Sequence, residues 1–326
     1  MSGIRFVYTL YTICIYHLNF RECSIGSNFV ILSAHMTHEL QKRMDRALES
    51  RYLACMFDYD GTLVERGYHM PLPQYIPSVL QDTSRKAYMA ICTARPFEGA
   101  FRDAHHMLGE HFDDLRAKWV WICENGGAGY LYDEESGTYK EFYRVAWPTN
   151  VMSKEKFVAL VHATFDHLVD QVDVQESVII LRPQQVDVPA EDIAAACEQI
   201  QNIGLNMLKE NGLYDEIRLG NSSLGVILYG VESDKNRGVA EFGKLLAAMG
   251  VALSDDLREI ILFGDRPVRY GNDAYFLNGK LGRPVTVGED IPEREDLISV
   301  IDENGERLMG PGATTYLLRK LSFKIL

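Results

Sequence analysis

Three short apolar runs in this chain each stop abruptly at a side chain that can do chemistry, and this pattern constrains the fold more than any other feature. Residues 52–57 end in Asp58, residues 88–92 end in Thr93, and residues 260–264 end in Asp265. Such runs, bounded by turn residues, are typical of buried strands. The carboxyl ends of strands in an open α/β sheet are where these sheets bind ligands. We therefore expect an α/β fold with its site at one edge of the sheet.

Asp58 and Asp60 form the most informative pair in the chain. They stand two residues apart in the string F-D-Y-D-G-T-L, and this spacing places both side chains on the same side of an extended chain. One carboxylate of such a pair can serve as nucleophile or metal ligand while the other moves a proton. The alternative is a strand that ends in a solvated turn, which the rest of the sequence makes less favoured.

Four motifs in order resemble those of the haloacid dehalogenase superfamily of phosphoryl-transfer enzymes. D-x-D-G-T-L at Asp58 resembles the first motif, and T-A-R-P at Thr93 resembles the second, in which Ser or Thr binds the phosphoryl group. Ala94 stands where the relevant branch usually has glycine. Lys235 fits the third motif, and Asp265 with G-N-D at residues 271–273 resembles the fourth, an acidic metal-binding loop. The resemblance extends from about residue 51 to the C-terminus.

This resemblance implies a fold and a branch of the superfamily. The fold is a Rossmann-like doubly wound parallel sheet core with an inserted α+β cap domain of type C2. A lid between the second and third motifs, with E-N-G-G just before it, is similar to the type IIB (Cof-like) branch. That branch includes sugar-phosphate phosphatases and eukaryotic-type phosphomannomutases. We expect the core at residues 36–126 and 231–326, the cap at 127–230, and an N-terminal extension at 1–35.

The chemistry of the expected site follows from its charges. An aspartate that attacks a phosphate dianion is repelled unless cations neutralise both groups, and Mg²⁺ prefers carboxylate and phosphate oxygens. Asp58 would form the aspartyl-phosphate, Asp60 would act as general acid and base, and Thr93 and Lys235 would stabilise the transferring group. By resemblance, the substrate-binding residues are Gly61, Thr93, Ala94, Arg95, Asn125 and Lys235. The expected Mg²⁺ ligands are Asp58, Asp60 (through its main-chain carbonyl), Asp265, Asn272 and Asp273.

Several of these residues have a second interpretation. Thr93 is a good candidate to cap a helix that starts near Pro96. Lys235 lies among charged residues and can be a solvated cation, in which case Arg237 is the substitute. Asp273 can orient the loop or a metal-bound water instead of binding the metal. The histidines of the helix expected at residues 97–112, His105, His106 and His111, are interpreted as an exposed face.

The segment between the second and third motifs has the pattern of an inserted unit. We expect a hairpin (129–132 and 139–146), a helix at 153–172, a strand at 177–181, a helix at 189–210, and strands at 215–219 and 224–229. This order predicts an antiparallel sheet with helices on one face. A helix at 237–249, strands at 259–263 and 284–287, and a helix near 314–321 then complete the core.

Composition indicates the class of protein and its compartment. With 326 residues, 47% of them hydrophobic, the chain can support two domains. A net charge of −13 argues against a broad nucleic-acid surface. Cysteines inside expected core strands suit a reducing compartment, so we expect a cytoplasmic enzyme with no membrane partner. Residues 6–18 are weakly signal-like, which leaves secretion as the alternative, and residues 1–35 read as a start site placed too early.

The expected function is Mg²⁺-dependent hydrolysis of a small phosphorylated metabolite, a sugar phosphate. The alternative is a phosphomannomutase-like mutase, which the long loop from Asp265 to Asp273 resembles. A mutase needs a second phosphate cluster in its lid, for which the candidates are Arg144, Arg182 and Arg218; solvated roles are favoured for these three. A non-catalytic binding protein is the least favoured interpretation, because all the expected catalytic residues are present. The residues guessed to select the substrate are Arg182, Gln184 and Gln185.

Overall fold

The computed structural model describes residues 38–67, 70–101, 119–148, 150, 152–291, 294 and 296–324. The chain divides into a short unit, Met1–Lys42, and a large unit, Arg43–Leu326, to which both large sheets belong. Residues 38–48 are helical. The interpretation of residues 1–35 and that of His105, His106 and His111 lie outside the described residues. Among the helices that are described, each is too short or too polar to cross a bilayer.

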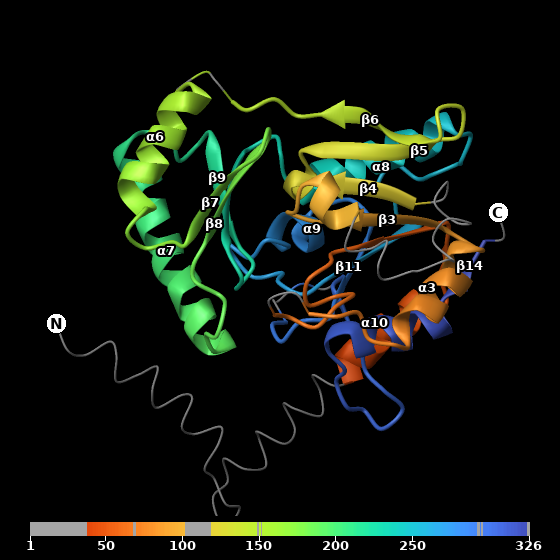
Figure 1. The fold of residues 1–326 in the computed structure, drawn as a ribbon. Coiled ribbons are helices and arrows are strands. Elements are labelled where there is room, and N and C mark those ends of the chain that lie inside the picture. Colours follow the sequence, from red (N-terminus) through yellow and green to blue (C-terminus); the bar gives the residue numbers. More distant parts are fainter. Residues whose placement is uncertain are drawn as a thin grey trace, which may run out of the picture. The chain divides into compact units, whose positions relative to one another are not determined.

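Within the described residues the main sheet has eight strands, in the order β13-β12-β11-β2-β3-β4-β5-β6 (Figure 1). The strands are β2 (Ala54–Phe57), β3 (Tyr88–Cys92), β4 (Trp119–Cys123), β5 (Ala128–Asp133), β6 (Thr138–Arg144), β11 (Ile260–Gly264), β12 (Arg283–Thr286) and β13 (Ile298–Ser299). The pairings from β13 through β4 are parallel. The chain moves outward from β2 to β4 and returns on the other side as β11 to β13, so the order reverses between β2 and β11. The expected doubly wound α/β class is confirmed.

Helices cover this sheet because its strands present apolar side chains to both faces. Besides the helical residues 38–48, the named helices of the described part of the chain are α3 (Ile76–Ser84), α6 (Lys154–Phe165), α7 (Ala190–Glu210), α8 (Lys235–Ala248), α9 (Ala274–Asn278) and α10 (Gly310–Lys320). Met56 of β2 and Leu262 of β11 share a buried cluster with Phe242 of α8 and Phe276 of α9. The next residues along these strands point to the opposite face. Strands β2 and β11 are thus buried along their whole length.

A second, four-stranded antiparallel sheet has the order β7-β8-β10-β9. Its strands are β7 (Gln171–Val174), β8 (Val178–Arg182), β9 (Ile217–Asn221) and β10 (Val226–Gly230). Helices α6 and α7 lie on one face, where Phe165 and Leu208 join Leu181 and Leu228 in a buried cluster (Figure 1). The opposite face carries a smaller cluster that includes Ile180 and Ile227, against which Ala94 packs. This face therefore contacts the loop that follows β3.

Two expectations about the inserted segment were wrong. The hairpin β5–β6 extends the main sheet by antiparallel pairing of β5 with β4 and does not join the second sheet. The cause is the tight turn η2 (Glu124–Gly126), in which Glu124 and Asn125 have positive φ and the chain reverses at once beside β4. The helix expected at 153–172 ends at Phe165, and residues 171–174 form β7. Their alternation of polar and apolar residues is only four residues long, which is too short to stand out from a helical pattern.

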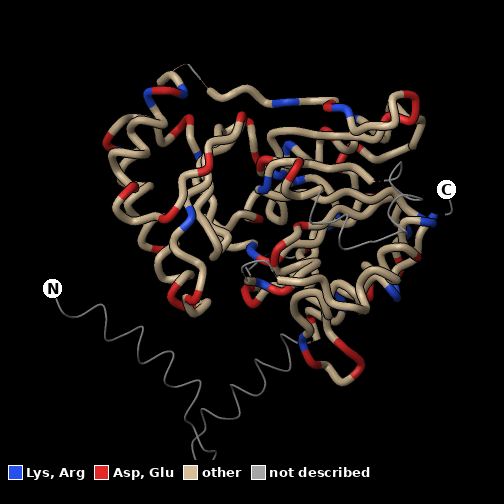
Figure 2. Tube along the Cα trace, viewed as in Figure 1, with Lys and Arg blue, Asp and Glu red and all other residues tan. Residues whose placement is uncertain are grey.

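Charged residues of both signs are interspersed along the described trace (Figure 2). The whole chain has a net charge of −13. Binding of an anionic ligand would therefore depend on cations placed next to it. The cations next to the ends of β2 and β11 are therefore the ones to consider.

Candidate active site

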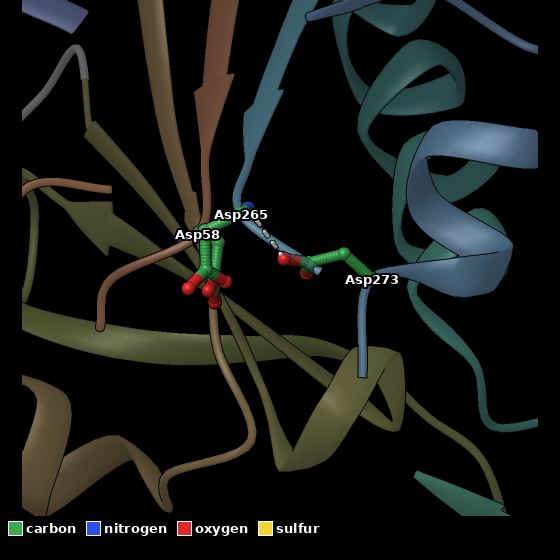
Figure 3. A group of neighbouring side chains, drawn as sticks. All are labelled: Asp58, Asp265 and Asp273. Atoms are coloured by element: carbon green, nitrogen blue, oxygen red, sulfur yellow. Dashed lines mark hydrogen bonds between the residues drawn. The ribbon is translucent and has the colours of Figure 1, made fainter. Parts of the chain in front are cut away.

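Three buried carboxylates meet at the reversal between β2 and β11. Asp58 follows β2, Asp265 follows β11, and Asp273 immediately precedes α9. One carboxylate oxygen from each lies within 4.8 Å of the others. Figure 3 shows the side chains of Asp58 and Asp265 next to each other at the ends of adjacent strands, with Asp273 pointing to the main chain of Asp265. The expected convergence of residues from distant parts of the sequence is thus present.

Lys235 is completely buried and bridges two of these carboxylates. Its Nζ lies 2.5 Å from Oδ1 of Asp58 and 2.6 Å from Oδ1 of Asp273. Burial by itself lowers the pKa of Lys235, but the carboxylates of Asp273 and Asp58 outweigh burial and raise it overall. The side chain therefore carries a positive charge inside the acidic cluster, and the interpretation of Lys235 as a solvated cation is wrong. Arg237, its suggested substitute, is half exposed and pairs with Glu241 at 2.8 Å.

Each carboxylate has its own electrostatic setting. Burial and the nearby charge of Asp273 raise the pKa of Asp58 well above its usual range, while Lys235 opposes the shift. Burial also raises the pKa of Asp265, to about 7, against the lowering effect of Arg66. Burial acts on Asp273 too, yet Lys235 and two backbone N–H groups lower its pKa overall. A bound divalent cation would offset the repulsion between carboxylates that are clustered in this way.

The donor atoms fit a magnesium ion. Mg²⁺ binds oxygen and commonly takes one or two carboxylates together with substrate phosphate. Oδ2 of Asp58 is buried and has no hydrogen-bond partner among the described residues, so it has the capacity of a ligand. Asp265 is its natural companion across the strand reversal. Asn272, another expected ligand, lines the same pocket and has a buried Oδ1 that likewise has no partner in the described part of the chain.

Asp273 is occupied on both of its oxygens. Oδ2 accepts the N–H groups of Asp265 at 2.9 Å and Arg266 at 3.1 Å, while Oδ1 accepts from Lys235. These contacts fix the end of β11 to the lysine. Of the two interpretations left open by the sequence, they favour orientation of the loop over direct metal binding.

Asp60 and Gly61 follow Asp58 in a tight turn. The carboxylate of Asp60 pairs with Arg95, at 2.7 Å from Nη2 and 3.2 Å from Nε. Gly61 has φ of +76°, and a Cβ on it would lie 2.1 Å from Oδ2 of Asp265. Only glycine allows the turn to approach Asp265 this closely. The turn therefore sets both the direction of Asp60 and the room around Asp265.

Thr93 and Ala94 line the neighbouring wall of the site, whereas Asn125, expected to bind substrate, is fully buried behind Thr93 and does not line the pocket. Oγ1 of Thr93 accepts the N–H of Arg95 at 3.3 Å, and the carbonyl of Thr93 accepts the N–H of Asn125 at 2.9 Å. Because the Thr93 oxygen accepts this bond, its own hydrogen can point to a ligand. The helix that follows begins at Phe97, so this bond to Arg95 lies before the helix and is not the capping contact that the sequence offered as a second interpretation. The methyl group of Ala94, absent from a glycine, packs against the second sheet.

Arg66 was not identified from the sequence. Its guanidinium donates to Oδ2 of Asp265 across 199 positions of the chain. The residue follows the D-x-D-G-T-L string by a few positions, in a loop with no periodicity, so no local signal distinguished it from a solvated arginine. It supplies a further cation at the acidic cluster.

A pocket of about 330 Å³ opens on these residues. Its core side includes Asp58, Asp60, Thr93, Arg95 and Asp265. Its other side comes from the second sheet and includes Gln171, Asp173, Gln175, Ile180, Arg182, Gln185 and Ile227. Of the residues guessed to select a substrate, Arg182 and Gln185 line the pocket. Gln171 and Asp173 of β7, and Gln175 directly after it, were missed because β7 itself was not recognised.

Comparison with known proteins identifies the fold. No protein-family model matches the chain, and no curated protein matches its sequence. Among solved structures, the N-terminally truncated, IMP-bound IMP-nucleotidase of Plasmodium falciparum is similar with a TM-score of 0.56 and 14% identity, over 85% of this chain and 70% of that one. A haloacid dehalogenase-like hydrolase from Bacteroides thetaiotaomicron is similar with a TM-score of 0.52 and 14% identity, over 82% and 99%. The chain therefore has the fold of haloacid dehalogenase-like hydrolases.

Proposed function

We propose that this protein is a Mg²⁺-dependent phosphatase that hydrolyses a small phosphate monoester through an aspartyl-phosphate on Asp58. The observation that supports it most strongly is the buried Lys235 bridging Asp58 and Asp273 at the strand reversal. A buried cation between carboxylates is costly to maintain, and here it is bonded to Asp58, which lines the pocket that an ester would enter. The likeness to hydrolases of the same fold agrees with this proposal.

The reaction is two displacements at phosphorus. One carboxylate oxygen of Asp58 attacks the phosphorus, the bond to the ester oxygen breaks, and Asp60 gives that oxygen a proton. Asp60 then takes a proton from a water molecule, whose oxygen attacks the phosphorus of the acyl-phosphate. The bond between phosphorus and the Asp58 oxygen breaks, which releases inorganic phosphate and restores the Asp58 carboxylate. Mg²⁺ held by Asp58, Asp265 and the Asp60 carbonyl would neutralise the phosphate charge. Lys235 and the Thr93 hydroxyl would bind the remaining phosphate oxygens.

In this mechanism Arg95 can pair either with Asp60 or with the phosphate of the substrate. It holds Asp60 in the structure, and an arriving phosphate offers its guanidinium a more highly charged partner. We propose that Arg95 moves to the phosphate and so leaves Asp60 able to exchange its proton. This step would couple substrate binding to the readiness of the general acid.

The leaving group would contact the second sheet, which we propose as a cap spanning roughly residues 147–230. Its pocket face carries a polar group beside aliphatic side chains: Nε of Arg182 donates to Asp173 at 2.7 Å, and the amide of Gln171 donates to the same carboxylate. A guanidinium paired in this way is neutralised, so it suits hydroxyl groups better than a second phosphate. We therefore propose an uncharged, hydroxyl-rich leaving group, as in a sugar phosphate.

The same contacts argue against the mutase alternative. Of the three arginines considered, Arg144 lies on β6 of the main sheet and pairs with Glu124 at 2.9 Å, Arg182 pairs with Asp173, and Arg218 pairs with Asp234. Each is neutralised by a carboxylate, and their partners lie in different elements. They do not form a cluster for a second phosphate, and they are not the solvated charges that the sequence favoured.

A nucleoside monophosphate is the second candidate substrate. The similar Plasmodium protein is described as an IMP-nucleotidase with IMP bound. In this chain, Ile180 and Ile227 give the pocket an aliphatic wall against which a base could rest. Both substrate classes belong in the first experiment.

That experiment measures release of inorganic phosphate from hexose phosphates, a sugar-alcohol phosphate and IMP, with Mg²⁺ or with EDTA. We expect release with Mg²⁺ and a loss of at least about 100-fold with EDTA, because the neutralising charge is removed. Addition of excess Mg²⁺ should restore the rate. Release that is equally fast in EDTA would contradict the metal assignment, and no release from any ester would contradict the phosphatase.

Arg182→Gln tests the leaving-group site. For the preferred sugar phosphate we expect KM to rise about 10-fold or more, since a charge-assisted hydrogen bond contributes about 1.5–3 kcal/mol. Hydrolysis of a small aryl phosphate without hydroxyl groups should change little. Arg85→Gln, on an exposed arginine paired with Asp82 at 3.1 Å, is the matched control. Equal losses for both esters would show that Arg182 does not contact the leaving group.

A further inference from the structure

Strand β9 of the cap pairs with the loop that leads into Asp273. The N–H of Asn221 donates to the carbonyl of Tyr270 at 2.7 Å, and the N–H of Asn272 donates to the carbonyl of Asn221 at 3.2 Å. These two bonds make a parallel β-bridge at the end of β9. The backbone that positions Asp273 is therefore hydrogen-bonded to the cap as well as to the core.

Arg218, three residues earlier on the same strand, contacts neighbours of both Lys235 and Asp273, the buried ion pair described above. Its guanidinium donates to Asp234, the residue before Lys235, and it lies 4.0 Å above the ring of Tyr275. Tyr275 is the second residue of α9, the helix that begins directly after Asp273. A single cap side chain thus touches the first turn of each helix on which Lys235 and Asp273 depend.

The loop before Asp273 has a conformation that needs support. Tyr270 has φ of +65°, which is unfavourable for a bulky side chain. A Cβ on Gly220 would lie 3.3 Å from the Cα of Asn272, so the two backbones approach closely. Strained backbone of this kind persists where surrounding contacts determine it, and here those contacts come from β9.

We infer that Arg218 is a positioning residue for the reaction proposed above. By holding Asp234 and Tyr275, it aligns Lys235 with Asp273, and hence with Asp58, when the cap is docked. A displacement of about 1 Å in such a group lowers catalysis by about 100-fold. Groups that bind the phosphate directly are not removed, so the effect should fall on kcat and spare KM.

The test compares Arg218→Ala with Arg258→Ala. Both arginines are about one-third exposed and paired with an aspartate, but Arg258 lies away from the site and pairs with Asp256 at 2.8 Å. For Arg218→Ala we expect a fall in kcat of about 100-fold, a nearly unchanged KM for a small aryl phosphate, and faster amide hydrogen exchange in residues 265–273. Arg218→Lys keeps the charge opposite Asp234 and should recover part of the rate. Arg258→Ala should change neither kcat nor KM, and it should leave amide exchange in residues 265–273 as in the wild type.

Exchange is measured without substrate, so it tests the inference independently of the activity. If Arg218→Ala leaves both exchange in residues 265–273 and kcat unchanged, the inference is wrong. If exchange accelerates as expected while the wild type hydrolyses no ester, the positioning contact stands and the proposed function fails. Should Arg218→Ala not fold, Tyr275→Leu removes the ring beneath the guanidinium and is read in the same way.

Discussion

Asp58→Asn is expected to abolish phosphate release and to leave the fold intact. The amide cannot form the acyl-phosphate, and loss of a nucleophile of this kind costs at least about 10⁴-fold in kcat. The cost to stability should be small, because burial and Asp273 already raise the pKa of Asp58 and so oppose its charged form. The amide oxygen can still accept a bond from Lys235. Phosphate release and thermal unfolding of the same preparation measure the two effects.

Trapping of the phosphoryl-enzyme tests whether Asp58 is the nucleophile. After acid quenching during turnover, the wild type should carry a phosphoryl group that hydroxylamine releases, and Asp58→Asn should carry none. Asp82→Asn, on a carboxylate that is 68% exposed, is the matched control and should behave as the wild type. A phosphoryl adduct on another residue, or residual turnover above about 1%, would remove Asp58 from the role of nucleophile.

The main sheet could be predicted because its strands are continuous apolar runs with abrupt ends. Residues 54–57, 88–92 and 260–264 are buried on both faces, so nothing in them competes with a strand pattern. The place of the β5–β6 hairpin could not be predicted, since its alternation suits either sheet. What decides it is the reversal at Glu124 and Asn125, whose positive φ values give no signal in side-chain periodicity.

In the candidate site too, some residues could be predicted from the sequence and others could not. Asp58, Thr93, Lys235 and Asp265 were found because strand and helix ends display them, and local pattern marks those ends. Arg66 was not, because its contact with Asp265 depends on how a loop folds across the sheet. The partners of the cap arginines were also hidden. An arginine paired within 4 Å and a solvated one look alike until distant strands are placed together.

Lys235 is the residue whose loss should affect both activity and stability most clearly. Its Nζ is completely buried between Asp58 and Asp273. Lys235→Met fills a similar volume but leaves both carboxylates buried without their cation. Removing one partner of a buried pair costs about 3–5 kcal/mol. Loss of the positive charge bonded to Asp58 should lower kcat by about 10³-fold or more.

The loss of stability in Lys235→Met should depend on pH and on Mg²⁺. Without Lys235, the folded-state pKa of Asp58 rises further above its unfolded value, so the folded protein binds more protons and its stability falls as pH rises. Destabilisation should therefore be larger at mildly alkaline than at mildly acidic pH, and Mg²⁺ should reduce it by binding the folded state. Lys244→Met is the control, because this lysine is on the same helix, 67% exposed and paired with Glu241 at 2.9 Å; it should shift the free energy of unfolding by less than about 0.5 kcal/mol. Equal unfolding curves for the two variants would mean that the Lys235 charge does not hold the carboxylates together.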